Sequence, residues 1–130
     1  MNPFVEIENV TLSYSDELRE PAVQDLSISI EEGEFSAVVG PSGCGKSTLM
    51  KLVTGLLFPQ AGQVRVDGAQ VDSPLKIAGM AFQNPVMLPW RKTLENLLLP
   101  LEIVSPHRER LRKEKKAYHQ QAEELLKTVG

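Results

Sequence analysis

The residues with the clearest chemical pattern form one stretch, Gly40-Pro41-Ser42-Gly43-Cys44-Gly45-Lys46-Ser47-Thr48. It matches the phosphate-binding pattern G-x-x-x-x-G-K-[ST] at every specified position. Its glycines allow successive backbone N–H groups to turn inward and bind an anion. Lys46 supplies a positive charge for the β- and γ-phosphates, and the Ser47 hydroxyl is suited to ligate Mg²⁺. The stretch predicts a nucleoside triphosphate site, and the alternative is a glycine-rich turn without a ligand.

A loop of this kind requires a strand before it and a helix after it. Residues 35–39 form a continuous apolar run, typical of a strand buried on both faces. Apolar residues with helical spacing follow the loop, at Leu49, Leu52, Val53 and Leu56. Gly55 is placed to cap that helix, whose N-terminus adds a dipole that favours phosphate.

Alternating apolar residues predict further strands around this motif. Val5 and Ile7 alternate with polar neighbours, and the pattern resumes at Val10, Leu12 and Tyr14 after a slip at Glu8-Asn9, which predicts a bulge. Two more alternating series are Leu26, Ile28, Ile30 and Val64, Val66. Turns are predicted at residues 31–34, 59–62 and 67–68 and a loop at 15–21. A second apolar run, residues 77–82, ends the strand-rich part.

The remaining residues predict helices. Prolines interrupt residues 86–90, which therefore cannot form a regular helix. Thr93 is the predicted N-cap of a helix that Pro100 should kink or stop. Ser105-Pro106 should begin a second helix with Gly130 as its C-cap. The apolar stripe of this helix is predicted at Leu111, Tyr118, Ala122, Leu125 and Val129.

The bulk composition is that of an ordinary globular domain. The chain has 130 residues, 42% of them hydrophobic, and a formal net charge of −3, which does not suggest a nucleic-acid partner. Cys44 is the only cysteine, so a reducing compartment is expected. The N-terminus does not resemble a signal peptide, and no apolar run approaches the roughly 20 residues of a membrane-spanning helix. We therefore expect one cytosolic domain.

The sequence of the loop, residues 40–48 followed by Leu49, resembles the Walker A motif of ATP-binding-cassette (ABC) transporter ATPases. Tyr14 occupies the place of that family's A-loop aromatic, which stacks on adenine, and Val66-Asp67-Gly68 resembles the hairpin after Walker A. Ala81-Phe82-Gln83 with Leu88-Pro89-Trp90 resembles the Q-loop region, and Thr93-Leu94-Glu95-Asn96 the helix after it. No Asn-Lys-x-Asp motif of a GTPase occurs. A P-loop kinase is disfavoured by the context of Tyr14, Gln83 and Trp90.

This resemblance implies an α/β P-loop NTPase fold with an antiparallel β part and the start of a helical subdomain. Residues 1–130 would be a single domain, with a core over 1–90 and helices over 91–130. The implied ATP-binding residues are Tyr14, Gly40, Ser42, Gly43, Cys44, Gly45, Lys46, Ser47 and Thr48. Ser47 and Gln83 would ligate Mg²⁺, and Gln83 would also position the attacking water. Taken alone, Tyr14 is more simply a packing residue and Gln83 a loop hydrogen-bonder.

The resemblance also implies partners. In this family the region around residues 83–90 receives the coupling helix of a transmembrane permease, and two ATPase subunits form a dimer. The chain would then be peripheral on the cytoplasmic face of the inner membrane. The sequence Leu88-Pro89-Trp90 resembles the corresponding segment in ATPases of importers of nitrate, sulfonates, taurine and thiamine precursors.

Several parts of a complete ABC ATPase are missing from the sequence. No four-residue apolar run precedes an Asp-Glu pair, as in Walker B, and no Leu-Ser-Gly-Gly signature occurs. His107 and His119 lie in the basic helical region, so neither is a credible switch histidine. We interpret the chain as the N-terminal, truncated portion of an ATPase subunit. Its function is then ATP binding to energise import or, alternatively, nucleotide binding without turnover.

Overall fold

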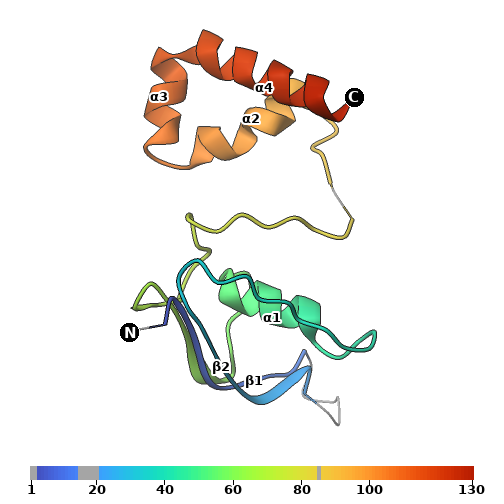
Figure 1. Cartoon of the computed structure of the whole chain (residues 1–130), viewed down its shortest axis with the longest axis vertical. Coiled ribbons are helices and arrows are strands. Elements are labelled where there is room, and N and C mark those ends of the chain that lie inside the picture. The colour runs from blue at the N-terminus through green and yellow to red at the C-terminus, as the bar shows by residue number, and fades with distance from the viewer. Residues whose placement is uncertain (1–2, 15–20, 85) are drawn as a thin grey trace. The chain divides into compact units, whose positions relative to one another are not determined.

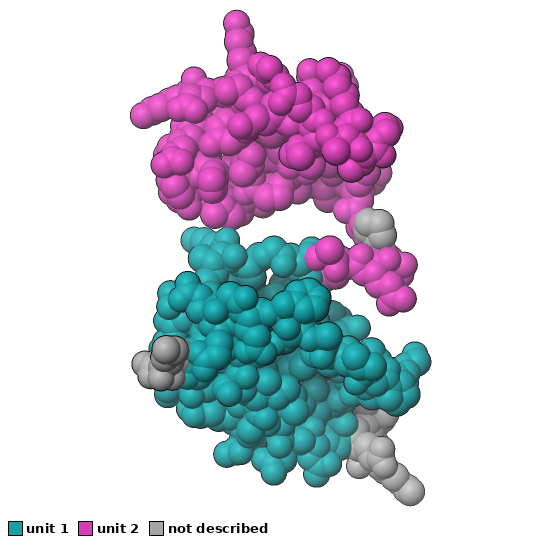
Figure 2. All heavy atoms as spheres, in the orientation of Figure 1, with its two compact units in different colours: residues 1–80 teal, residues 81–130 magenta. Residues whose placement is uncertain are grey.

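The structure, a computed structural model, describes residues 3–14, 21–84 and 86–130. The chain divides into two units, Met1–Met80 and Ala81–Gly130, which Figure 2 colours separately. The predicted loop at residues 15–21 lies almost entirely outside the described residues.

An antiparallel sheet forms the framework of the first unit (Figure 1). Its strands are β1 (Val5–Leu12), β2 (Val23–Ile30), β3 (Ala61–Val66) and β4 (Ala69–Gln70), in the order β2-β1-β3-β4. Val5 lies opposite Ile30 on one side and Val66 on the other. The alternating series predicted these strands correctly. Asp67 and Gly68 both have positive φ, 52° and 71°, as a two-residue hairpin turn requires.

The predicted bulge in β1 is confirmed at Asn9. Its φ is 48°, and the pairing register with β2 shifts between Ile7 and Val10. Ser27 of β2 holds the bulge, because its hydroxyl accepts from the Asn9 amide at 2.9 Å and donates to the Asn9 side chain at 3.0 Å. The extra residue keeps the apolar side chains before and after it on the same buried face.

The apolar core of the first unit lies between this sheet and α1 (Lys46–Val53). Its buried members are Val5, Ile7, Val10, Leu12, Val23, Leu49, Leu52, Val64, Val66 and Val71. Gly55 ends the helix as predicted: with φ at 74°, its amide donates to the Leu52 carbonyl, and the Leu56 amide donates to Lys51. The series with helical spacing was predicted to reach Leu56, but the helix ends at Val53 and Leu56 is exposed.

The predicted buried strand at residues 35–39 is wrong. The preceding turn forms, with the Glu34 amide bonded to the Glu31 carbonyl at 3.3 Å, but the run after it is not a strand. Phe35 is 95% exposed and Val39 92%. A strand needs neighbouring strands to bond its backbone, and within the described ranges no strand pairs with this run.

The second apolar run, residues 77–82, is likewise irregular and not part of the sheet. In the first unit Ile77 is 70% exposed, and in the second unit Phe82 is 54% exposed. The physical reason is the same, since an apolar composition favours a strand but does not supply the partner that would bond to it.

The second unit contains α2 (Thr93–Ile103), α3 (His107–Lys113) and α4 (Lys115–Val129). Leu98 and Ala122 are its buried apolar residues among those described. Both α3 and α4 contact α2. No helix in the described part of the chain is long and apolar enough to cross a membrane.

Several predicted details of these helices need correction. Lys92, not Thr93, is the N-cap, because its backbone is extended and its amide donates to the Glu95 carboxylate at 3.0 Å. Pro100 does not stop α2, because its carbonyl still accepts the Val104 amide at 3.1 Å; the alternative, a kink at Pro100, stays a prediction.

The predicted second helix is in fact two helices. The backbone of Glu114 leaves helical geometry, which separates α3 from α4 while both stay against α2. On the predicted stripe Ala122 is buried, whereas Leu125 and Val129 are exposed. The half-buried residue in the turn after Ala122 is Leu126, four positions along the same helix face. Gly130 is the C-cap of α4, as predicted.

Candidate functional site

Residues 40–45 form a loop that leads into α1, whose first residues are Lys46, Ser47 and Thr48; residues 40–44 of this loop are exposed. Gly43 and Gly45 have φ of 83° and 96°, a left-handed conformation that turns backbone amides toward one side. Gly45 is the N-cap of α1, and its carbonyl accepts the Leu49 amide at 2.9 Å. The first four amides of a helix lack intrahelical partners, so the loop places free donors and a helix dipole together.

Gly45 also permits a close approach to the sheet. A Cβ atom at this position would lie 2.4 Å from the Ala22 carbonyl oxygen and 3.5 Å from the Val23 side chain. Only a residue without a side chain fits there, and Val23 is the buried first residue of β2. The loop therefore rests directly on the start of that strand.

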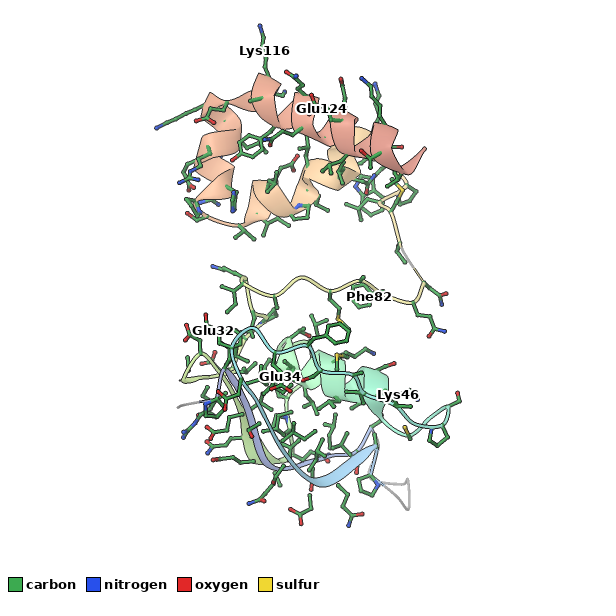
Figure 3. The ribbon with its side chains drawn as sticks, viewed as in Figure 1. Glu32, Glu34, Lys46, Phe82, Lys116 and Glu124 are labelled. Atoms are coloured by element: carbon green, nitrogen blue, oxygen red, sulfur yellow. The ribbon has the colours of Figure 1, made fainter. Side chains whose placement is uncertain are left out.

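The Lys46 ammonium folds back over the loop from the start of α1 (Figure 3). Its Nζ donates to the carbonyls of Gly40 at 2.8 Å and Pro41 at 2.5 Å and lies 3.6 Å from the Cys44 sulfur. Carbonyl oxygens are weaker partners for an ammonium than charged phosphate oxygens are. A positive charge beside inward-turned amides fits a polyphosphate.

Tyr14 reaches the same loop from the end of β1. Its hydroxyl lies 3.0 Å from the Thr48 hydroxyl, although the two residues are 34 positions apart in sequence. Thr48 is buried at 5% exposure, whereas Tyr14 is 56% exposed. The structure thus brings Tyr14 to the loop through an atom that sequence reasoning did not consider.

The other predicted site residues are less constrained. Ser42, Cys44 and Ser47 are exposed on the first unit. Gln83 belongs to the second unit, on an exposed irregular segment. Across the residues that the structure describes, no three His, Cys, Asp or Glu side chains cluster as a metal site. Ser47 and Gln83 remain the predicted Mg²⁺ ligands.

Sequence reasoning missed two residues that support the loop. Ala22 lies under Gly45, and the Gln60 side chain accepts the Ser13 amide at 2.7 Å, beside Tyr14. Gln60 is held in turn, since its own amide donates to the Thr11 carbonyl at 2.9 Å. No local pattern marks either residue, because both act through long-range backbone contacts.

A charged turn precedes the segment that enters the loop. The Glu34 carboxylate accepts the Glu31 amide at 2.9 Å and the Ser36 hydroxyl at 2.8 Å. These two donors, the amide first, lower the pKa of Glu34 below its usual value. The carboxylate stabilises the turn in its charged form.

The second unit has a cavity of about 370 Å³ that contains none of the predicted site residues. An ion pair at its edge joins Arg91 and Glu102 at 2.8 Å. The lining residues are Arg91, Glu95, Leu98, Glu102, Lys115 and His119.

The sequence of this chain is similar to those of known proteins. The sequence model of the ABC transporter family matches residues 23–130. The taurine import ATP-binding protein TauB of Yersinia pestis is 38% identical over 104 residues, 80% of this chain and 41% of TauB. The bicarbonate transport ATP-binding protein CmpD of Synechococcus elongatus is 40% identical over 106 residues, 81% of this chain and 38% of CmpD. The chain thus spans about two fifths of the length of these relatives.

Solved structures agree with the sequence comparisons. The ATP-binding cassette MJ0796, in a dimeric post-hydrolysis state with ADP and Pi, matches with a TM-score of 0.74. It is 30% identical, and the match covers 95% of this chain and 56% of MJ0796. A second dimeric structure of MJ0796 matches with a TM-score of 0.69 at 31% identity, over 84% of this chain and 54% of that one. The fold is therefore a partial P-loop NTPase cassette.

Proposed function

Because the chain belongs to the ABC transporter ATP-binding family, we propose that residues 40–48 bind Mg·ATP as part of an importer's ATPase subunit. One observation carries this proposal furthest. Two left-handed glycines, Gly43 and Gly45, lead into the start of α1, and the Lys46 ammonium folds back onto the carbonyls of the same loop.

Lys46, the backbone amides and Ser47 each have a role in ATP binding that follows from their chemistry. Lys46 exchanges its bonds to the Gly40 and Pro41 carbonyls for phosphate oxygens, which are stronger acceptors for an ammonium. The amides at the start of α1 hold the same phosphates, and the Ser47 hydroxyl is placed for Mg²⁺. Bound Mg·ATP would supply the phosphoanhydride whose hydrolysis energises transport.

The proposed partner in the membrane is a permease subunit that contacts residues 83–90. Trp90 is 76% exposed, and Val86 and Met87 are 85% and 51% exposed, on irregular backbone. Asn96 holds this backbone, because its side chain donates to the carbonyls of Leu88 and Arg91 and accepts the Leu88 amide at 2.7 Å. An exposed apolar patch on a fixed backbone is suited to docking.

The import role is proposed by similarity to TauB and CmpD, which are named for taurine and bicarbonate. We place the chain on the cytoplasmic side of a membrane through its permease, and a second ATPase subunit completes the dimer. The transported solute is chosen by the membrane and solute-binding subunits, so the ATP-binding part does not determine it.

The second candidate is a nucleotide-binding module without turnover. The sequence favours it directly, because it contains no Walker B acid pair and no Leu-Ser-Gly-Gly signature. The acid pair includes the carboxylate that orients the attacking water, so we expect no turnover by this chain alone.

One experiment tests both candidates. ATP affinity and steady-state phosphate release are measured on the chain and on Lys46→Ala. We expect saturable Mg·ATP binding that the variant loses, with no turnover by either protein. Absence of binding to the unaltered chain would refute the proposed function. Steady hydrolysis that Lys46→Ala abolishes would instead reject the non-catalytic candidate.

A further inference from the structure

Residues 108–116 form a basic patch on a chain that is otherwise acidic. They carry six lysine or arginine side chains and two glutamates, which gives them a formal net charge of +4. The whole chain has a net charge of −3, so the remaining residues carry −7. The basic side chains of the patch are Arg108, Arg110, Arg112, Lys113, Lys115 and Lys116.

The structure leaves the basic patch open to solvent. All six basic residues are exposed, and they lie on α3 and on the first turn of α4. The half-buried residues of α3 include His107 and Leu111, one turn apart, so Lys113 lies on the opposite side of this helix. Figure 3 shows the Lys116 side chain extending away from α4. The patch is therefore a surface and does not take part in the packing between helices.

Neither ion pairs nor helix stability accounts for these charges. Within residues 3–14, 21–84 and 86–130, Arg108 is the one member of the patch with a salt bridge, to Glu109 at 3.5 Å. Lys115 and Lys116 lie in the first turn of α4, which contains no acidic residue. Positive charge at a helix N-terminus opposes the helix dipole, so these two lysines destabilise α4 unless an anion lies nearby.

We propose that the basic patch contacts the anionic lipid headgroups of the membrane at which the importer works. This inference rests on the proposed function, because the permease would hold the chain at the cytoplasmic surface. Anionic lipids give that surface a negative potential, which attracts clusters of lysine and arginine within about 8 Å at physiological salt. The contact supplements the permease contact at residues 83–90, which belong to the same unit.

A membrane fits this distribution of charge better than a nucleic acid does. A planar surface meets one face of a protein, so the acidic remainder of the chain can stay clear of it. Nucleic-acid-binding domains are usually basic as a whole, whereas this chain has a net charge of −3. Proteins that bind single strands also use exposed aromatic rings, and residues 108–116 contain no aromatic residue.

Co-sedimentation of the chain with lipid vesicles tests the inference without ATP or a permease. The vesicles contain either phosphatidylcholine alone or equal parts of phosphatidylcholine and phosphatidylglycerol. We expect binding only to the vesicles with phosphatidylglycerol, and loss of that binding when the salt is raised from about 0.1 M to about 1 M. Equal binding to both kinds of vesicle would overturn the inference, because it would mean adsorption through apolar residues.

Two matched double variants locate the contact. Lys113→Gln with Lys116→Gln removes two charges from the patch, and Lys76→Gln with Lys127→Gln removes two from exposed positions elsewhere. Each cation near the lipid contributes about fivefold, so we expect the patch variant to bind vesicles at least about tenfold more weakly and the control to change about twofold or less. Lys113→Arg with Lys116→Arg keeps the charge and should bind as the unaltered chain does. Circular dichroism checks each fold, and equal losses in the patch and control variants would reject the patch.

Failure of this inference can be told apart from failure of the proposed function. ATP affinity is measured on the same proteins, and the patch variant should keep it. ATP binding without vesicle binding rejects the inference alone, whereas vesicle binding without ATP binding rejects the proposed function and leaves the lipid contact standing. A single-stranded RNA oligonucleotide is tested in parallel. Binding to RNA through the same lysines, and more tightly than to vesicles, would reject the membrane as the partner.

Discussion

The two segments that flank the phosphate-binding loop differ sharply. On its C-terminal side, α1 packs Leu49 and Leu52 into the core against the sheet. On its N-terminal side, residues 35–39 are irregular, with Phe35 and Val39 more than nine-tenths exposed. The loop is therefore anchored from one side and by its contact with Ala22.

The difference shows what each kind of element needs. A helix bonds its backbone within itself, and α1 needs only an apolar surface, which β1 and β3 supply. A strand takes its backbone bonds from neighbours, and the sheet of the described residues does not extend to residues 35–39. The same loop thus joins a segment stabilised by core packing to one that is not.

The largest expected effect comes from removing a packed side chain. Leu52 is fully buried, so Leu52→Ala should lower the free energy of unfolding by about 2–5 kcal/mol. Val39→Ala is the matched deletion on the other segment and should change it by about 0.5 kcal/mol or less. Urea unfolding measures both. Similar losses would mean that residues 35–39 are packed after all.

Replacing each of two loop glycines, Gly45 and Gly43, with alanine tests whether the contact with Ala22 anchors the loop. Gly45→Ala adds left-handed strain and a Cβ that would lie 2.4 Å from the Ala22 carbonyl, so the loop must move. Gly43→Ala adds strain alone, about 1–3 kcal/mol, because nothing lies within 4 Å of its Cβ. Urea unfolding should show a larger loss for Gly45→Ala, and isothermal titration should show a larger loss of ATP affinity. If the Gly45→Ala protein is as stable as the Gly43→Ala protein, the contact with Ala22 does not anchor the loop.

Thiol labelling of Cys44 can report whether a nucleotide occupies the loop between the two segments. It is exposed, and its sulfur lies 3.6 Å from the Lys46 ammonium, beside the proposed phosphate position. We expect a thiol reagent to label it severalfold more slowly when Mg·ATP is bound. Mass spectrometry measures the rate, and Lys46→Ala should remove the protection. Equal rates with and without ATP would place the nucleotide elsewhere.

The smallest expected effect concerns the turn before residues 35–39. Because its folded-state pKa is lowered, charged Glu34 stabilises the fold above its ordinary pKa of 4.5. That contribution is lost as the pH falls from 4.5 through the lowered folded-state pKa. Glu34→Gln should therefore melt slightly below the unaltered chain at pH 7, with the difference shrinking in acid. A difference that grows in acid would contradict this assignment.

Much of this molecule follows from sequence because its contacts are periodic or local. The alternation of Val5 and Ile7, the slip at Asn9 and the cap at Gly55 each predicted a feature that the structure contains. The failed prediction depended on partner strands, since residues 35–39 have a strand's composition but pair with no strand in the part of the chain that the structure describes. The motif predicted the loop, but the contact of Tyr14 with Thr48 joins residues 34 positions apart, which no spacing rule reveals.

The central claim is that residues 40–48 bind the phosphates of ATP. Amide chemical shifts from ¹⁵N-labelled protein, titrated with Mg·ATP, test it most directly. The account predicts saturable shifts that are largest at Gly43, Gly45 and Lys46 and smaller at residues 35–39. Saturable shifts confined to other residues, or none in this loop at millimolar Mg·ATP, would contradict it.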